Sequence, residues 1–199
     1  AVETIKDAGL RSFIKTAMAV PGHGENTVVA DKYRRLEDLP DGSWGRQVAT
    51  MYATYGWPYP GEKHGAPEMT AQHDWVHVLS GYPPTPVGEL QVNTYMAVSS
   101  DDPMSFGGIF LAMSLYGLGG ISLPIGNFTS QGGAYDRPDI GALFSEAVNR
   151  SAAVRVDFFD FDHWGSAKTS VEQLREQYEI PAKTVDIGDP DPGLASPPA

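Results

Sequence analysis

Apolar residues recur along this chain in stretches with helical spacing, and short runs rich in proline and glycine separate these stretches. Between positions 44 and 55 the apolar side chains follow the i, i+3, i+4, i+7 spacing of one helix face, at Val48, Met51, Tyr52 and Tyr55. The Asp-Gly-Ser run that ends at Ser43 is a start signal, and Gly56 is a stop signal. The pattern therefore predicts a helix that ends at Gly56.

The same reasoning predicts helices over residues 2–18, 68–80, 89–100, 139–154 and 170–180. An apolar segment at 104–120 contains glycine pairs that would allow close packing of helices. Residues 155–164 alternate weakly, which indicates either a short strand or an extended entry to a helix. The expected fold class is mainly α: a single-domain, helical bundle-like fold of about six helices with little or no sheet.

The length of 199 residues suits one domain of ordinary size. We expect a single helical domain over residues 1–181. Residues 182–199 are polar and rich in proline, which predicts a C-terminal tail that is mobile or wrapped on the surface.

Charge and composition exclude several classes of protein. A net charge of −11 argues against a nucleic-acid partner and against adsorption to an anionic membrane, because both need clustered Lys and Arg. No apolar run reaches the roughly 18 residues of a membrane span. The absence of cysteine excludes disulfides and thiolate chemistry, and it fits a cytoplasmic location. Peripheral association with a membrane and a homodimer are left open.

Metal-binding side chains gather in the predicted helix 68–80. His73 and His77 are four residues apart, so they share one helix face, and Asp74 lies on the flank of that face. Glu89 begins the next predicted helix, and the loop before it is long enough to bring this carboxylate opposite the two rings. The pattern predicts a metal site made of His73, Asp74, His77 and Glu89.

Two imidazoles with one or two carboxylates suit Zn²⁺ best, with Fe²⁺, Mn²⁺ or Mg²⁺ as alternatives. The competing interpretation is a buried helix that carries two histidines for structural reasons. A zincin-like hydrolase is a further alternative, because the pattern is near His-Glu-x-x-His. Asp74 stands where that pattern has its glutamate, and its shorter side chain reaches less far toward a water.

The motif His73-Asp74-x-x-His77, followed by eleven residues and Glu89, resembles the signature of the Coq-four family of coenzyme Q (ubiquinone) biosynthesis proteins. HVLSGY and VGEL, at 77–82 and 87–90, are similar to the turn and the helix start of that signature. LPDGSWGR at 39–46 and the segment 162–180 resemble flanking stretches of the family, so the likeness spans about residues 30–181.

The resemblance implies a helical protein whose His73, Asp74, His77 and Glu89 hold a metal. It also implies an enzyme that removes a carboxyl group from a prenylated aromatic precursor and installs oxygen. We therefore expect a metal-dependent lyase or oxidative decarboxylase that takes an aromatic or conjugated acid in a hydrophobic groove. The alternative is a non-catalytic lipid- or quinone-binding scaffold with a structural metal.

Arg46 is a weaker candidate, because a cation near a helix start could meet a substrate carboxylate. An Arg at such a position is more often the partner of a surface ion pair. We retain Arg46 as a substrate-binding hypothesis beside that reading.

Overall fold

The computed structural model describes residues 25–119, 131–154 and 156–185. Within these ranges the chain forms seven α-helices and no strand, and an isolated bridge joins Ser43 to Ser170. The prediction of a mainly α fold is therefore confirmed. The α-helices are α2 (Thr27–Arg34), α3 (Trp44–Tyr55), α4 (Glu68–Ser80), α5 (Pro86–Ser99), α6 (Gly107–Ala112), α7 (Ile140–Ser151) and α8 (Val171–Gln177).

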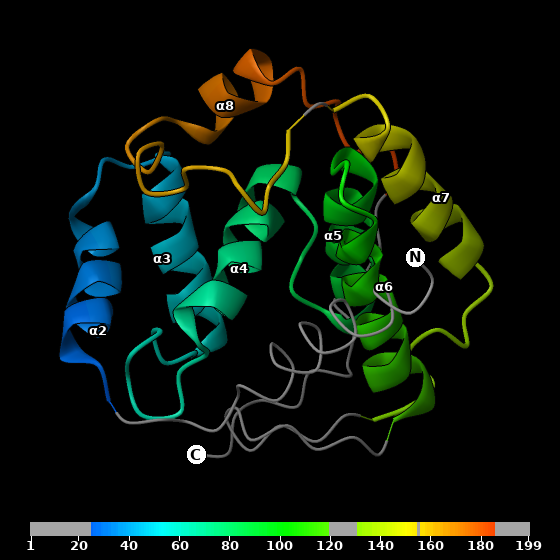
Figure 1. The fold of residues 1–199 in the computed structure, drawn as a ribbon, viewed down its shortest axis with the longest axis horizontal. Coiled ribbons are helices and arrows are strands. Elements are labelled where there is room, and N and C mark those ends of the chain that lie inside the picture. The colour runs from blue at the N-terminus through cyan, green and yellow to red at the C-terminus, as the bar shows by residue number, and fades with distance from the viewer. Residues whose placement is uncertain (1–24, 120–130, 155, 186–199) are drawn as a thin grey trace, which may run out of the picture.

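Two groups of helices make up the molecule (Figure 1). The first group holds α2, α3 and α4, and the second holds α5, α6 and α7, with α8 across one end of the first. α4 packs against α3, α5 and α8, and α5 packs against α6 and α7. The pair α4 and α5 therefore joins the two groups, and this pair carries the predicted metal ligands.

α3 and α4 end where their glycines predict. Gly56 and Gly81 follow the last residues of these helices, with φ of 64° and 79°. These are left-handed conformations that glycine adopts without a Cβ penalty. The predicted bounds 68–80 for the second of these helices are confirmed.

α5 begins at Pro86, three residues before the start expected at Glu89. Thr85 caps the helix, since its side chain accepts a hydrogen bond from the Gly88 backbone N–H at 3.2 Å. Proline is well tolerated at the first helical position, where its missing N–H would have no partner in any case. Glu89 consequently lies in the first turn of α5 on rigid backbone rather than at a fraying end.

Other predictions need correction. Helix α2 and the following 3₁₀ turn η1 (Arg35–Asp38) were not predicted; Asn26 caps α2 by accepting the Val29 backbone N–H at 3.2 Å. The described residues of 155–164 form turns and irregular backbone, so the strand alternative is wrong. The last helix ends at Gln177 rather than at 180.

The apolar segment at 104–120 is broken into three short pieces. They are the 3₁₀ turn η2 (Pro103–Phe106), the helix α6 and the π-helical turn η3 (Met113–Leu118). A Cβ on Gly108 would lie 2.3 Å from Asn93 Oδ1, so a glycine of this segment does permit the close packing against α5 that was expected.

Some predictions fall outside the described residues. They concern the helix over 2–18 and the tail beyond 185. The first tail residues are described, and the Thr184 backbone N–H donates to Glu146 Oε1 at 3.2 Å. None of the described helices has the length and apolar character needed to cross a membrane.

Aromatic side chains fix α3 against α4. The Trp44 indole N–H donates to the Trp75 carbonyl at 2.8 Å, and the two rings meet edge to face with centroids 5.2 Å apart. Further along α3, the Tyr52 ring lies 6.3 Å from that of Tyr33 in α2. The backbone of α4 therefore sits on a rigid layer just behind its histidines.

Candidate metal centre

α4 presents His73, Asp74 and His77 as one cluster. Each residue offers a ligand atom, and these atoms lie within 4.8 Å of one another. The cluster follows from helix geometry, because positions i and i+4 lie one above the other on a helix face. Trp75, Val76 and Leu79 are fully buried and hold the rest of this helix in the core.

Glu89 joins the cluster from the first turn of α5. Its Oε1 lies 3.1 Å from His77 Nε2, and its Oε2 lies 3.4 Å from His73 Nε2. The carboxylate therefore faces both imidazole rings, as the sequence analysis expected. The structure brings all four predicted ligands together.

Backbone carbonyls set the tautomer of both histidines. The His73 Nδ1–H donates to the Thr70 carbonyl at 2.6 Å, and the His77 Nδ1–H donates to the Tyr82 carbonyl at 3.0 Å. These bonds assign the ring proton to Nδ1, so each Nε2 carries a lone pair. Metal-bound histidines are usually oriented in this way by an acceptor on the other ring nitrogen.

The Asp74 carboxylate is held on its outer side. The Tyr52 hydroxyl donates to Asp74 Oδ2, while Oδ1 lies 3.3 Å from His73 Nε2. Tyr52 was predicted only as part of the apolar face of its helix, and it is buried. Its contact with Asp74 was missed, because no local pattern links two residues 22 positions apart on different helices.

The facing atoms are all acceptors if both rings are neutral. Each Nε2 lone pair then points at a carboxylate oxygen, which is repulsive unless a proton or a cation lies between them. Among the described residues no Lys or Arg pairs with Asp74 or Glu89; their ion-pair partners are the two histidines. The site therefore favours a positive charge between these atoms, which either a proton on an imidazole or a bound cation would supply.

The pKa values of His73, Asp74 and Glu89 reflect both this charge pairing and burial. Burial alone would lower the pKa of His73, but the carboxylates of Asp74 and Glu89 outweigh it and raise this pKa to about 10. Burial raises the pKa of Asp74. Burial would also raise the pKa of Glu89, yet the two imidazoles hold it well below its usual range.

This donor set fits a divalent metal. Two imidazole nitrogens and two carboxylates, each with a partner behind it or a rigid helix beneath it, are ligands that zinc, iron and manganese accept. The side chains of Asp74, His77 and Glu89 are 8%, 0% and 15% exposed, and that of His73 is 26% exposed. The cluster is thus closed on the core side and more open at His73.

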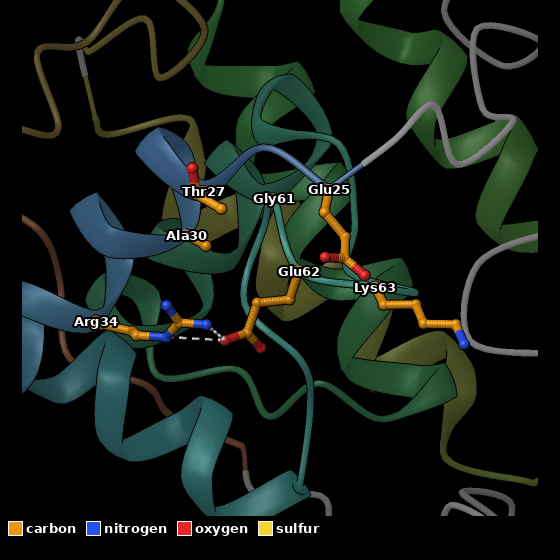
Figure 2. A pocket seen from close by; sticks show the side chains of 7 residues that line it. All are labelled: Glu25, Thr27, Ala30, Arg34, Gly61, Glu62 and Lys63. Atoms are coloured by element: carbon orange, nitrogen blue, oxygen red, sulfur yellow. Dashed lines mark hydrogen bonds and ion pairs between the residues drawn. The ribbon is translucent and has the colours of Figure 1, made fainter.

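Two cavities lie away from this cluster. One, of about 240 Å³, lies between the start of α2 and the loop around Gly61, where the Arg34 guanidinium pairs with Glu62 (Figure 2). The other, of about 420 Å³, is lined by Lys32, Arg35, Lys168 and Trp164 together with aliphatic side chains. None of the four predicted ligands lines either cavity, so the expected substrate groove beside them stays a prediction.

Arg46 makes its polar contacts just before its own helix. Its guanidinium lies 3.6 Å from Asp41 Oδ1 and donates to the Glu37 carbonyl. These contacts fit the surface ion-pair reading. A role in binding substrate stays a prediction.

Fold and cluster together define a class: an all-α protein in which two consecutive helices hold a His-Asp-His group able to bind a metal ion, with a glutamate facing both rings. No family model matches the sequence, and no curated protein matches it.

A solved structure shares the fold. It is a protein of Nostoc punctiforme with a proposed role in ubiquinone biosynthesis. The comparison gives a TM-score of 0.55 at 13% identity and covers 89% of this chain and 84% of that chain. The resemblance to the Coq-four family that the motif suggested is therefore confirmed at the level of the fold.

Proposed function

We propose that this protein is a metal-dependent enzyme of the Coq-four type that acts on an aromatic or conjugated acid, with His73, Asp74, His77 and Glu89 as metal ligands. The observation that carries the proposal is the position of Glu89. Its two oxygens lie 3.1 Å from His77 Nε2 and 3.4 Å from His73 Nε2. Among the described residues, no Lys or Arg pairs with this carboxylate. The shared fold supports the choice of substrate class.

The chain's own residues would divide the work of the site. A divalent metal held there, with zinc favoured and iron, manganese or magnesium as alternatives, would act as a Lewis acid toward a carboxylate or phenolate oxygen of the substrate. Tyr52, Thr70 and Tyr82 would fix the orientation of the ligands through the bonds described above. The buried apolar side chains of α4 would keep water from the core side, and His73 marks the side from which a substrate could approach.

Metal content tests the ligand set. Freshly purified wild-type protein should contain close to one equivalent of a divalent metal by elemental analysis, and His77→Ala and Glu89→Ala should lose it. The matched control is His64→Asn, which removes an exposed loop histidine and suits the positive φ of 67° at that position. A wild-type protein that contains no metal, and takes up none from zinc, manganese or ferrous solutions, would contradict the proposal.

Turnover separates the enzyme from the scaffold alternative. The mostly buried ligands from two consecutive helices would also suit a metal that only ties α4 to α5. Release of carbon dioxide from a prenylated aromatic acid by the metal-loaded wild type supports an enzyme. Loss of that release in Glu89→Gln, measured at a zinc concentration at which this variant is folded and metal-loaded, would exclude a purely structural metal. Binding of the same ligand without turnover would favour the scaffold.

The zincin-like alternative gains no support from the contacts of Asp74. Its Oδ2 accepts the Tyr52 hydroxyl and its Oδ1 faces His73, so neither oxygen is free to serve a water as a general base. Peptide cleavage that depends on Asp74 would be needed to support this alternative.

We retain a cytoplasmic location and a homodimer as open hypotheses, to be tested by fractionation and by solution mass.

A further inference from the structure

The turn between α4 and α5 carries the acceptor that orients His77. Tyr82 is the second residue after α4, and its carbonyl accepts the His77 Nδ1–H at 3.0 Å. This bond leaves His77 Nε2 facing Glu89 at 3.1 Å. A displacement of the Tyr82 backbone would therefore change both the tautomer and the direction of this ligand.

The Tyr82 side chain is held by residues that lie far along the chain. Its hydroxyl donates to Glu146 Oε2 at 2.6 Å, which links it to α7, 64 residues further along the chain. The Arg150 guanidinium lies over the same ring, 5.2 Å from its centroid. All three side chains are buried. We call Tyr82, Glu146 and Arg150 the Tyr82 clamp.

Residues shortly after α8 hydrogen-bond to Arg150 and Glu146 of this clamp. The Arg150 Nε–H donates to the Pro181 carbonyl at 2.6 Å, and the Thr184 backbone N–H donates to Glu146 Oε1 at 3.2 Å. Both carboxylate oxygens of Glu146 are thus engaged. The Lys183 ammonium also donates to the Gly81 carbonyl at 3.3 Å, directly beside Tyr82.

We propose that Tyr82 is a positioning residue for the metal ligand His77, and that Glu146 and Arg150 set its place. This inference rests on the proposed function, because it concerns the orientation of one of the proposed ligands. Glu146 and Arg150 are charged side chains buried in α7, and burying such groups costs free energy unless they have fixed partners. Tyr82 is one of those partners. Through Tyr82, Glu146 and Arg150 hold the turn whose carbonyl binds His77 Nδ1–H and so leaves Nε2 facing Glu89.

The simplest competing explanation is that the clamp only stabilises the core. That explanation predicts that any lost hydroxyl in this region weakens the fold without a specific effect on His77. Tyr95 provides the matched control. Its ring packs edge to face against Tyr82, 5.9 Å away, and its buried hydroxyl has no hydrogen-bond partner among the described residues.

The experiment compares Tyr82→Phe and Glu146→Gln with Tyr95→Phe in the full-length protein. Zinc affinity is measured by competition with a chelator, and the absorption spectrum of the Co²⁺ form reports the geometry of the ligands. We expect about tenfold weaker zinc binding and an altered Co²⁺ spectrum in the two clamp variants. Tyr95→Phe should match the wild type in both.

A second readout uses the metal-free protein, so it does not depend on the proposed function. Imidazole ¹⁵N chemical shifts should show a proton on His77 Nδ1, held by the Tyr82 carbonyl, in the wild type and in Tyr95→Phe, and a weakened or lost Nδ1–H signal in Tyr82→Phe. Wild-type protein that binds no metal would overturn the proposed function. The His77 chemical shifts would still test whether the Tyr82 clamp orients His77. Unchanged His77 shifts in Tyr82→Phe, or equal effects in Tyr95→Phe, would overturn the inference. Should Glu146→Gln fail to fold, Tyr82→Phe alone decides.

Discussion

Tyr52 shows how a single buried hydroxyl supports this site. It donates to Asp74 Oδ2 from the neighbouring helix, and Asp74 is otherwise a carboxylate in a dry environment. Tyr52→Phe leaves that oxygen without a donor. We expect a loss of about 1–3 kcal/mol in the free energy of unfolding of the metal-free protein and about tenfold weaker zinc binding.

Urea unfolding and chelator competition measure these two effects. The control is Tyr55→Phe, because Tyr55 lies one turn further along the same helix, is partly exposed and stacks on Trp57. Should both variants bind zinc as the wild type does, Tyr52 has no part in the metal site.

His163 makes stability depend on pH outside the candidate metal centre. Its ring is buried between aromatic side chains, and burial lowers its pKa to about 4. In the described part of the chain its Nε2 has no hydrogen-bond partner. In the unfolded chain the pKa is about 6.5, so the unfolded state takes up a proton first as the pH falls. Stability is therefore lost from about pH 6.5 down to about pH 4 and is unaffected above this window.

His163→Phe should remove this dependence, because a phenyl ring fits the aromatic surroundings of Trp44 and Phe161 and cannot be protonated. We compare the unfolding free energy of the variant with that of the wild type at each pH. The advantage of the variant should be about 2 kcal/mol larger at about pH 5 than at about pH 7. Urea unfolding of both proteins at the two pH values provides the measurement. An equal difference at both values would show that His163 is already accessible to protons in the folded state.

At the scale of the elements, the entry to α5 decides where Glu89 lies. Gly88 precedes it, and a Cβ on Gly88 would lie 1.7 Å from the Pro83 carbonyl oxygen, which is backbone and cannot move aside alone. Gly88→Ala should therefore push the first turn of α5 away from the loop. We expect a loss of about 3 kcal/mol in unfolding free energy, a Tm lower by roughly 10 °C, and weaker metal binding.

Gly141→Ala is the matched control, since Gly141 lies in the first turn of α7 and its Cβ would meet nothing within 4 Å. Alanine favours a helix over glycine, so this variant should be neutral or slightly more stable. Thermal unfolding of both variants tests the pair. Equal effects would mean that the close contact at Gly88 does not constrain the helix start.

The bounds of the elements show what local signals can predict. α3 and α4 were placed correctly, because their apolar spacing, glycine stops and flanking prolines all act within a few residues. α2 was missed because only Ala30 and Tyr33 of its eight residues are buried, which leaves a weak apolar pattern. α5 was started late because three prolines in 83–86 read as a loop, whereas the last of them takes the first helical position.

For the molecule as a whole, the candidate metal would link its two groups of helices, because the ligands come from α4 and α5 (Figure 1). A metal that binds the folded state alone stabilises it by about 2.7 kcal/mol at a free concentration 100 times the dissociation constant. Zinc added to chelator-treated protein should therefore raise the Tm by roughly 5–10 °C. His77→Ala should show no such increase, whereas His64→Asn should behave as the wild type.

Calorimetry with and without zinc checks this expectation. A wild-type Tm that does not respond to zinc, manganese or iron would mean that the four side chains do not bind a metal in the folded state. An equal increase in His77→Ala would place the bound ion at another position.

Local sequence patterns were enough to predict the helical class, the bounds of α3 and α4, and the shared face of His73 and His77. These features depend on hydrogen bonds and side-chain spacing within one or two turns of a helix, which a single stretch of residues contains in full. The sequence also predicted that Glu89 could reach the two rings, because only eight residues separate α4 from that carboxylate.

The contacts that hold the candidate ligands could not be predicted in this way, because they depend on tertiary packing. The hydroxyl of Tyr52 on Asp74 and the clamp of Glu146 on Tyr82 join residues 22 and 64 positions apart. No periodicity encodes such pairs, since they form when helices pack and buried polar groups must find partners in the same small volume. The sequence pattern predicted the candidate ligands, and nearby carbonyls in α4 and the turn after it orient the two histidines. The packing of helices gave Asp74 its hydroxyl donor and brought Glu89 opposite both rings.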